Sequence, residues 1–402
     1  RGVRANGIVK KCWGHYTSPR QAWNYRSQIS FEICNLRFAI PKGRQIRLQS
    51  EWTNLTKGAI KIFFGRRPLN MPQLRKDPVV GRWVIISTER GKRPGHYEHP
   101  KNPPRNGPCP FCEGNEETTP PEIMAYRPAE TNRGGPGWTL RVVPNKFPAL
   151  MIEGDLDRHG DGVFDMMNGV GAHEVIIETP NHETNMGALS EKQFEEVVWA
   201  YRDRILDLRE DKRFRYVLIF KNQGSAAGAT LEHTHSQLIA LPIVPRNVID
   251  ELAGAQEYYR YKERCIYCDI VRQELEERVR VVSENENFVV ICPFAPRFPF
   301  ETWILPKEHS SYFEHASKQE YIDLSRSLRE TLIRLNRALN DPPFNYIIHS
   351  MPFEEADNGH YHWHVEVMPK LTQVAGFEWG TGFYINPVTP EESTICLREI
   401  AL

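Results

Sequence analysis

The pattern of hydrophobic and polar residues from position 71 onward predicts short strands joined by turns and by two long helices. Runs rich in β-branched and aromatic residues, bounded by Gly, Pro and Asn, are typical of strands. Residues 190–211 place apolar side chains at helical spacing after Ser190, which is a suitable N-cap. In this first part we predict strands at 81–87, 175–179, 216–220 and 233–241.

The same order of features recurs in the second part of the chain. Each part has a Cys-x-x-Cys pair, a strand, a Pro-bearing turn with a histidine, a helix and a His-x-His strand. The turn histidine and the first strand histidine lie 51 residues apart in the first part and 53 in the second. We therefore predict an internal duplication, with a catalytic domain at 71–250 and a second domain at 251–402. The second part is expected to hold strands at 288–292, 302–305, 345–349 and 360–368 and a helix at 317–340.

Residues 1–70 differ from the rest of the chain in charge. They contain 14 Lys and Arg against 2 Asp and Glu, a net charge of +12, whereas residues 71–402 carry −12. They show no sustained helical or strand periodicity, and the coherent pattern begins at Met71. We expect 1–70 to be a poorly ordered extension or an upstream translation. The acidic remainder argues against general nucleic-acid binding.

The composition excludes several classes of protein. Hydrophobic residues make up 40% and charged residues 25%, which is ordinary for a globular protein. No apolar run of about 18 residues predicts a membrane span, and no short apolar core predicts a secretory signal. Eight cysteines are too few for a disulfide framework in a chain of this length. We therefore expect a cytoplasmic protein whose cysteine pairs bind metal.

Two zinc sites are predicted from the repeated cysteine and histidine spacing. A Cys-x-x-Cys turn supplies two thiolates, and two histidines complete the tetrahedron that zinc prefers. The alternative without a metal site is a buried structural cysteine pair beside solvent-facing histidines. Both pairs are expected in polar loops, which argues against thioredoxin-like redox chemistry. The first predicted set is Cys109, Cys112, His182 and His233, and the second is Cys265, Cys268, His309 and His362.

A small-residue loop followed by a His-x-His strand carries the strongest catalytic signal. Side chains alternate along a strand, so His233, His235 and Gln237 would point the same way. If His233 binds metal, His235 is held beside it as a neutral imidazole that can attack phosphorus. Gln237 would hydrogen-bond the non-bridging oxygen in the transition state. A His-x-His strand alone is more often a metal clip or a polar sheet face.

The loop before this strand changes that balance, because it is suited to phosphate. Gly224 and Gly228 would let main-chain amides approach phosphate oxygens closely. Asn222 and Thr230 add side-chain donors. A phosphate cradle directly followed by a fixed imidazole favours nucleophilic catalysis at phosphorus.

These residues resemble the active-site pattern of the galactose-1-phosphate uridylyltransferase family, a branch of the histidine-triad superfamily. The family pattern is Asn-x-Gly, Gly-x-Ser and His-Pro-His-x-Gln. The chain has Asn222-Gln-Gly224, Gly228-Ala-Thr230 and His233-Thr-His235-Ser-Gln237, so that Thr replaces Ser and Pro. The resemblance extends from Met71 to the C-terminus. It implies that His235 forms a nucleotidyl-enzyme intermediate, that Gln237 stabilises it, and that the loop holds phosphate.

Two further stretches resemble family motifs that contact the nucleotide. Thr88-Glu-Arg90-Gly-Lys-Arg93-Pro is similar to the N-terminal arginine motif, which implies a phosphate-binding role for Arg90 and Arg93. Val143-Pro-Asn145-Lys-Phe147 is similar to the base-binding strand, which implies nucleotide contact for Asn145. The alternative for the two arginines is that they lie at a solvent-exposed strand end and do not bind phosphate.

The resemblance implies an α+β fold of two tandem histidine-triad-like units, with antiparallel sheets flanked by helices. It implies double displacement, in which UDP-glucose gives its nucleotide to His235 and galactose 1-phosphate then takes it. Expected partners are an NDP-sugar, a hexose 1-phosphate and a second copy of the chain in a homodimer. Neither membrane nor nucleic acid is expected.

Alternatives remain for the second metal and for the substrate. Some family members hold iron with a Glu and three His, and His349, His362 and His364 are present here. The second Cys pair nevertheless favours a second zinc. Residues 376–387 depart from the sugar-recognising segment and resemble the ADP-glucose phosphorylase branch, in which AMP passes to inorganic phosphate. The other rivals are a nucleotide hydrolase of the same superfamily and a non-catalytic zinc module with a basic arm.

Overall fold

The computed structural model describes residues 71–92, 107–355 and 357–402. The chain divides into two units, and the second, Gln73–Leu402, holds all described residues except Met71 and Pro72. The expectations for residues 1–70 and for Arg93 lie outside the described residues. Across the described ranges, no helix combines the length and the apolar character needed to cross a bilayer.

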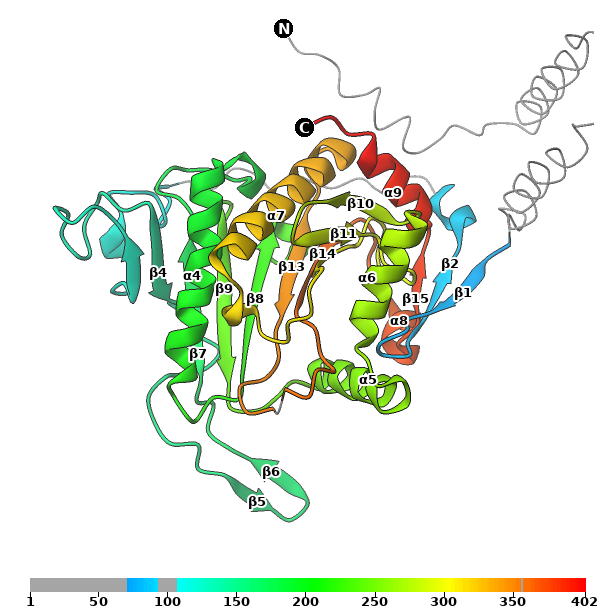
Figure 1. Ribbon diagram of the computed structural model, residues 1–402. Helices are drawn as coiled ribbons and strands as arrows, with labels where there is room; N and C mark the ends of the chain where they lie inside the picture. The colour runs from blue at the N-terminus through cyan, green and yellow to red at the C-terminus, as the bar shows by residue number, and fades with distance from the viewer. Residues whose placement is uncertain (1–70, 93–106, 356) are drawn as a thin grey trace, which may run out of the picture. The chain divides into compact units, whose positions relative to one another are not determined.

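A ten-stranded sheet, antiparallel at every pairing, runs through the Gln73–Leu402 unit (Figure 1). Its order is β10-β11-β12-β14-β13-β8-β9-β7-β4-β3. The strands of the first half are β3 (Met124–Tyr126), β4 (Leu140–Pro144), β7 (Ala172–Ile177), β8 (Tyr216–Gln223) and β9 (His235–Leu241). Those of the second half are β10 (Val281–Glu284), β11 (Phe288–Ile291), β12 (Thr302–Pro306), β13 (Phe344–His349) and β14 (His364–Pro369).

The two halves of this sheet have the same connectivity. Numbered along the chain within each half, the strands lie in the spatial order 1-2-3-5-4, counted inward from the outer edge. The halves meet where β8 pairs with β13, with Phe220 opposite Ile347. Because this junction is an ordinary antiparallel pairing, both halves belong to one continuous sheet.

Two long helices cover one face of the sheet. They are α4 (Glu191–Arg209) and α7 (Lys318–Leu339), which pack against each other and against strands of their own halves. Ser190 and Ser317 cap them in capping boxes with Gln193 and Glu320, so the predicted helices are confirmed. Both helices bury an apolar face. Each fully buried large apolar side chain stabilises the folded state by roughly 1.5–3 kcal/mol.

Two helices that the sequence pattern did not predict pack on the second half of the sheet. They are α5 (Arg246–Lys262) and α6 (Ile266–Glu277), whose apolar residues join those of β10, β11 and β12 in one core cluster. Cys265 is the N-cap of α6, and Cys268 lies in its first turn. The expected polar loop around the second Cys pair is therefore wrong: Ile266, Tyr267 and Val271 form a buried helical face.

The strand after the small-residue loop begins later than predicted. β9 starts at His235, because the amide of Thr234 donates to the carbonyl of Glu183. β14 likewise starts at His364, where the amide of Trp363 donates to the carbonyl of Ser310. In both halves the first His of the His-x-His therefore precedes the strand.

A three-stranded sheet forms from both ends of the described chain. It consists of β1 (Gln73–Lys76), β2 (Trp83–Ile86) and β15 (Tyr384–Asn386), with the short helix η1 (Thr88–Lys92) after β2. Val84 and Ile86 pack on Ala295, which ties this sheet to the second half. The helices α8 (Gly376–Thr381) and α9 (Pro390–Arg398) flank β15 along the chain.

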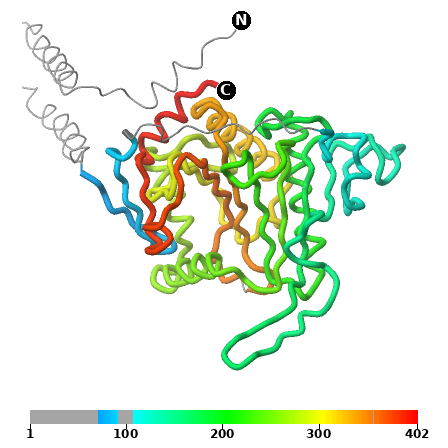
Figure 2. Tube along the Cα trace, turned by 180° about the vertical axis from the view of Figure 1, so that it is seen from behind, coloured from blue at the N-terminus to red at the C-terminus, as the bar shows by residue number. Residues whose placement is uncertain are grey.

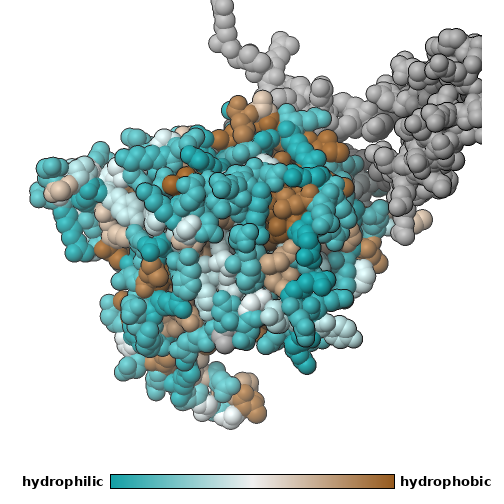
Figure 3. All heavy atoms as spheres, in the orientation of Figure 1, coloured by the Kyte–Doolittle hydropathy of each residue, from teal (hydrophilic) through white to brown (hydrophobic). Residues whose placement is uncertain are grey.

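A two-stranded hairpin, β5 (His159–Asp161) and β6 (Phe164–Met166), projects from the ten-stranded sheet (Figures 1 and 2). Hydrophobic side chains gather at its tip (Figure 3), where Val163 is 89% and Phe164 68% exposed. The remaining short helices are η2 (Glu116–Thr118), η3 (Met186–Ala188), η4 (Ser225–Ala227) and η5 (Phe313–His315).

Candidate active site and metal centres

The structure brings the four predicted ligands of the first site together. One donor atom from each of Cys109, Cys112, His182 and His233 lies within 4.8 Å of every other. Cys112 Sγ is 3.4 Å from His182 Nδ1 and 3.6 Å from His233 Nδ1. Sulfur and nitrogen ligands about 2.3 and 2.0 Å from a zinc at the tetrahedral angle lie about 3.5 Å apart. The side chains therefore fit a tetrahedral ion without rearrangement.

The ring orientation of His233 also suits a metal ligand. Its Nε2 lies 2.9 Å from the carbonyl oxygen of Thr179, an acceptor that fixes the proton on Nε2. Its Nδ1 is then unprotonated and faces the two cysteines. A metal-bound His usually donates its other N–H in this way, which fixes the tautomer.

The second site repeats this arrangement in the other half. Donor atoms of Cys265, Cys268, His309 and His362 all lie within 4.8 Å of one another. Cys268 Sγ is 3.4 Å from His309 Nδ1 and 3.5 Å from His362 Nδ1. The Nε2 of His362 lies 3.1 Å from the carbonyl oxygen of Pro306. Both predicted ligand sets thus have the spacing and the histidine orientation of a four-coordinate site.

Without a cation, the first cluster disfavours two neighbouring thiolates. Burial and the neighbouring Cys109 thiol raise the pKa of Cys112 to about 11. Two thiolates side by side repel each other in the absence of a positive charge, whereas a divalent ion stabilises both. The types of donor atom and the repulsion between the thiolates therefore both point to a bound divalent cation.

His235 lies at the start of β9, next to the first metal cluster. Its ring and that of His233 both contact Phe111, at centroid distances of 5.3 and 6.0 Å, so the two rings lie on the same side of the chain. Its Nδ1 lies 2.8 Å from the carbonyl oxygen of His233 and donates to it. Nε2 therefore keeps its lone pair. Burial, followed by the Lys221 charge, lowers the pKa of His235 to about 4, so the ring is neutral at pH 7.

Gln237 follows two residues later on the same face of β9. Its Oε1 lies 2.9 Å from Nε2 of His173, a β7 residue that the sequence pattern did not single out. His173 Nε2 is also 3.1 Å from Nδ2 of Asn145, the predicted nucleotide contact. The structure therefore connects Asn145 to Gln237 through one imidazole ring.

The small-residue loop lies between β8 and β9 and is exposed at Gly224, Gly228 and Thr230. Gly224 has φ +78°, and a Cβ there would lie 2.9 Å from Pro343, so the position requires glycine. The amides of Ala227, Gly228 and Ala229 donate to carbonyls within the turn. The Gly228 amide is thus used in shaping the loop.

Asn222 stands at the end of β8, on the face that carries Gln237. Phe220 pairs with Gln237, and continuing that antiparallel register places Asn222 level with His235. Asn345 of β13 donates to Asn222 Oδ1 at 2.7 Å and to the carbonyl of Ala227 at 2.8 Å. The amide group of Asn222 is thereby turned toward the loop. A residue of the second half thus orients a predicted phosphate ligand of the first.

A buried ion pair lies on the other face of the sheet, behind His235. Lys221 and Glu178 are 1% and 0% exposed, and Lys221 Nζ lies 2.7 Å from Glu178 Oε2. The same ammonium donates to Thr234 Oγ1 at 2.8 Å and to the carbonyl of His235 at 2.9 Å. The backbone of His235 is thus held from behind by a hydrogen-bonded ion pair with no net charge.

Arg90 is not brought together with these residues. It lies in η1, directly after β2, and β2 and β9 are well separated in the ribbon diagram (Figure 1). The β2 strand packs on the second half of the molecule instead. Within one chain, Arg90 therefore does not join the cluster around His235.

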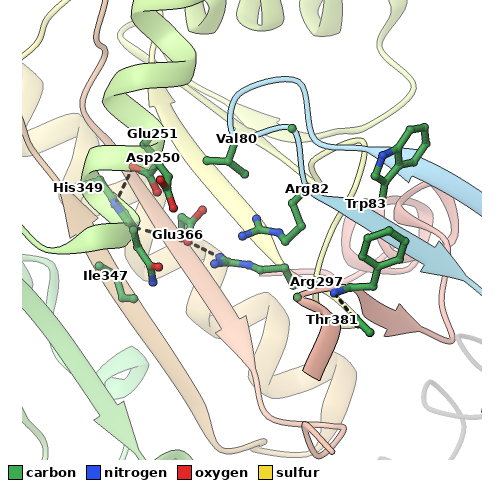
Figure 4. Close-up of a pocket in the computed structure, with 14 residues that line it drawn as sticks. Val80, Arg82, Trp83, Asp250, Glu251, Arg297, Ile347, His349, Glu366 and Thr381 are labelled. Atoms are coloured by element: carbon green, nitrogen blue, oxygen red, sulfur yellow. Dashed lines mark hydrogen bonds and ion pairs between the residues drawn. The ribbon is translucent and has the colours of Figure 1, made fainter. Parts of the chain in front are cut away.

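A third group of titratable residues occupies the position in the second half that corresponds to His235 and Gln237. Donor atoms of Glu251, His349, His364 and Glu366 lie within 4.8 Å of one another, beside a cavity of about 370 Å³ (Figure 4). Arg297 pairs with Glu366, and His349 Nδ1 is 3.1 Å from Glu251. His362 belongs to the cysteine cluster, so these histidines are divided between two groups.

The residues that the sequence did not indicate share one property: their partners lie on other strands. His173 and Asn345 contact the predicted site across strand pairings, and Lys221 and Glu178 meet through the core. The sequence does hold one signal for such residues: a polar residue within a run of apolar, strand-forming residues. Such a residue is buried only with a partner.

Comparisons with known proteins agree with this geometry. Residues 66–245 match the family described as Galactose-1-phosphate uridyl transferase, N-terminal domain, and residues 169–398 match a domain of unknown function, DUF4921. The chain is 39% identical to ADP-glucose phosphorylase of Arabidopsis thaliana, over 82% of this chain and 93% of that protein. It is 32% identical to galactose-1-phosphate uridylyltransferase of Thermotoga maritima, over 82% and 98%. A crystal structure of the Arabidopsis thaliana ADP-glucose phosphorylase with bound ADP-glucose has a TM-score of 0.71 and 37% identity, covering 83% of this chain and 100% of that one.

Proposed function

This chain belongs to the galactose-1-phosphate uridylyltransferase family, and we propose that it transfers a nucleoside monophosphate between sugar phosphates through His235. The preferred reaction is that of a UDP-glucose–hexose-1-phosphate uridylyltransferase, the activity named for most of the relatives. The single observation that carries the proposal is the state of His235. Its Nδ1 is engaged by the His233 carbonyl, so Nε2 keeps its lone pair, and the register of β8 and β9 places His235 level with Asn222, where the loop begins.

The reaction proceeds in two displacements. The lone pair of His235 Nε2 attacks the α-phosphorus of the NDP-hexose, an N–P bond forms, and the P–O bond to hexose 1-phosphate breaks with its electron pair. A phosphate oxygen of the acceptor sugar then attacks the same phosphorus, and the N–P electron pair returns to Nε2. The positive charge on the ring in the intermediate is stabilised by the Nδ1–H donation to the His233 carbonyl.

Neighbouring side chains bind and orient the transferred group. Asn222 and Thr230 are proposed to hold the phosphates with their side chains, and Gly228 to let the loop approach them closely. Gln237 is proposed to donate to a non-bridging oxygen as its charge grows. Asn145 is proposed to contact the nucleotide. These roles are supported by the common sheet face of Asn222 and Gln237 and by the exposure of the loop.

Both cysteine clusters are proposed to hold zinc. The four-ligand sets leave no open position, so the ions would stabilise the fold rather than take part in the reaction. In the first site, a metal bound to His233 would fix the carbonyl that orients His235. The two-sulfur, two-nitrogen donor sets support zinc over iron at both sites.

A second candidate function is ADP-glucose phosphorylase, in which inorganic phosphate accepts AMP. The 39% identity to the Arabidopsis thaliana enzyme exceeds the 32% to the uridylyltransferase of Thermotoga maritima, and it favours this candidate. The proposed chemistry at His235 is the same for both. Only the base and the acceptor differ.

We further propose that the two halves are tandem histidine-triad-like units, that the division falls near residue 250, and that the chain forms a homodimer. The repeated 1-2-3-5-4 strand order and the repeated cluster support the duplication. Arg90 lies apart from His235 within one chain, and a second copy that brings it to the nucleotide would account for its proposed role.

Transfer assays with two donors and two acceptors test the function. UDP-glucose and ADP-glucose, each radiolabelled in the α-phosphate, are incubated with galactose 1-phosphate or with inorganic phosphate, and the labelled products are separated. The preferred assignment predicts labelled UDP-galactose, and the second candidate predicts labelled ADP. Release of labelled nucleoside monophosphate alone would indicate a hydrolase, and no turnover with any pair would defeat the proposal.

A further inference from the structure

We propose that His173 is a positioning residue that fixes the side-chain amide of Gln237, so that its NH₂ group faces the transferred phosphoryl group. The inference rests on the proposed function, because it concerns how Gln237 serves His235. Its starting observation is that His173 Nδ1 has a backbone partner, Ala149, whereas Nε2 faces the side chains of Gln237 and Asn145.

The backbone partner determines which nitrogen of His173 carries the proton. The amide N–H of Ala149 donates to His173 Nδ1 at 3.1 Å. A backbone amide can only donate, so Nδ1 must be the acceptor. A neutral imidazole has one N–H, and here it is therefore on Nε2.

That proton determines the orientation of Gln237. Nε2–H points at the terminal amide of Gln237, at 2.9 Å, so the atom it meets must be the carbonyl oxygen Oε1. Asn145 offers this proton no acceptor, because its Oδ1 accepts from the amide of Phe147 at 2.9 Å and its donor Nδ2 lies 3.1 Å from Nε2. The backbone amide of Ala149, which cannot rotate as the Asn145 side chain can, therefore decides which ring nitrogen carries the proton. The NH₂ group of Gln237 is consequently turned away from His173.

The segment that supplies Ala149 is itself firmly attached. Its backbone pairs with the chain just before β7: Met151 donates to the carbonyl of Gly169 at 2.9 Å, and Gly171 donates to that of Met151 at 2.8 Å. A Cβ on Gly171 would lie 2.5 Å from both the Ala240 carbonyl and a Leu150 methyl. The close approach that this glycine allows therefore keeps the Ala149 amide in place.

The consequence for the reaction is a donor that is oriented before the substrate arrives. An amide that rotates freely presents NH₂ or C=O to the phosphate, and only NH₂ stabilises the negative oxygens. The fixed orientation removes the unproductive rotamer. Loss of a well-aligned donor slows reactions by about 10²–10³-fold, and loss of its alignment alone is expected to slow nucleotidylation about 10- to 100-fold.

The test measures the rate of His235 nucleotidylation in a single turnover, with the preferred NDP-sugar. His173→Leu removes both hydrogen bonds at similar volume, and the rate should fall about 10- to 100-fold. His173→Gln keeps one acceptor and one donor, and should restore most of the rate. His159→Leu, on the exposed hairpin, is the matched control and should behave as wild type.

A double-mutant cycle distinguishes positioning from a general structural role. If His173 acts through Gln237, His173→Leu should not slow the Gln237→Ala variant further. Multiplied effects, or a His173→Leu variant as fast as wild type, would overturn the inference while leaving the function intact. Absence of any adduct in the wild-type protein would instead be a failure of the proposed function.

Discussion

Charged side chains are buried near His235 in the first half of the sheet and near His364 in the second. Each of these charges has a partner of opposite sign. Behind His235, Lys221 and Glu178 neutralise each other with less than 2% of either side chain exposed. In the second half, His349 lies between the carboxylates of Glu251 and Glu366. Buried charges are tolerated only as pairs, so removal of a single partner should be far more harmful than removal of both.

Lys221→Met should destabilise the fold by about 3–5 kcal/mol, because it leaves the Glu178 carboxylate buried without a cation. The double variant Lys221→Met, Glu178→Gln should recover most of this loss. Urea unfolding followed by circular dichroism measures both values. Lys192→Met, which removes the exposed pair with Glu196, is the control and should cost less than about 1 kcal/mol. Equal losses in the single and double variants would contradict the ion-pair account.

His349 should make stability depend on pH at the alkaline end. Burial alone would lower its pKa, but Glu251 and then Glu366 raise the pKa of His349 to about 10. A raised folded-state pKa gives stability that is complete below about pH 6.5, the unfolded value, and is lost as pH rises through about 10. The difference in unfolding free energy between wild type and His349→Gln should therefore narrow between about pH 6 and pH 10. A constant difference would show that His349 is neutral throughout.

At the scale of elements, the strand–loop–strand unit from β8 to β9 carries the site. The loop is held by its own turn hydrogen bonds, by Asn345 and by the contact of Gly224 with Pro343. Its conformation is thus built from both halves of the sheet. A change that only displaces the loop should impair catalysis without removing any reacting group.

Gly224→Ala should lower the transfer rate by about 10- to 100-fold, because φ is +78° there and a Cβ would lie 2.9 Å from Pro343. Gly162→Ala is the matched control: its φ is +62°, but nothing lies within 4 Å of its Cβ. The Gly162→Ala variant should lose about 1 kcal/mol of folding stability and keep its full activity. Steady-state rates and melting temperatures of both variants check this. An active Gly224→Ala variant would show that the loop shape is not needed.

How much the sequence predicts depends on whether a signal is local. The long helices are predictable because Ser190 and Ser317 cap regular apolar patterns. The two clusters of cysteine and histidine are predictable because their spacing in the sequence repeats. The helix after Cys265 escapes prediction, because a Cys-x-x-Cys motif is typical of a loop. The contacts of His173 and Asn345 cannot be predicted, because strand order and register create them.

In the molecule as a whole, two similar halves share one sheet. They carry different residues at the start of two corresponding strands, β9 and β14. The first half has His235 and Gln237 beside an open loop. The second has His364 and Glu366 beside Arg297 and His349. The His364 ring is only 1% exposed and stacks on the His349 ring, with centroids 4.8 Å apart. A single reactive histidine per chain is therefore expected, together with two cysteine-bound ions.

Metal analysis of the purified protein should find about two zinc ions per chain, one for each cysteine cluster. Cys112→Ser and Cys268→Ser should each reduce the content to about one. Cys292→Ser is the control, because Cys292 is buried outside both clusters and should leave the content unchanged. Full occupancy in both cluster variants, or no metal in the wild type, would contradict the assignment.

The most direct test of the account is to find which residue carries the nucleotide. The protein is mixed with α-phosphate-labelled NDP-glucose without acceptor, quenched in alkali and digested, and the labelled peptide is sequenced by mass spectrometry. If His235 is the nucleophile, each chain should carry one acid-labile phosphoramidate on His235, which disappears in His235→Ala and is discharged by acceptor. A label on another residue, or turnover without any covalent adduct, would contradict it.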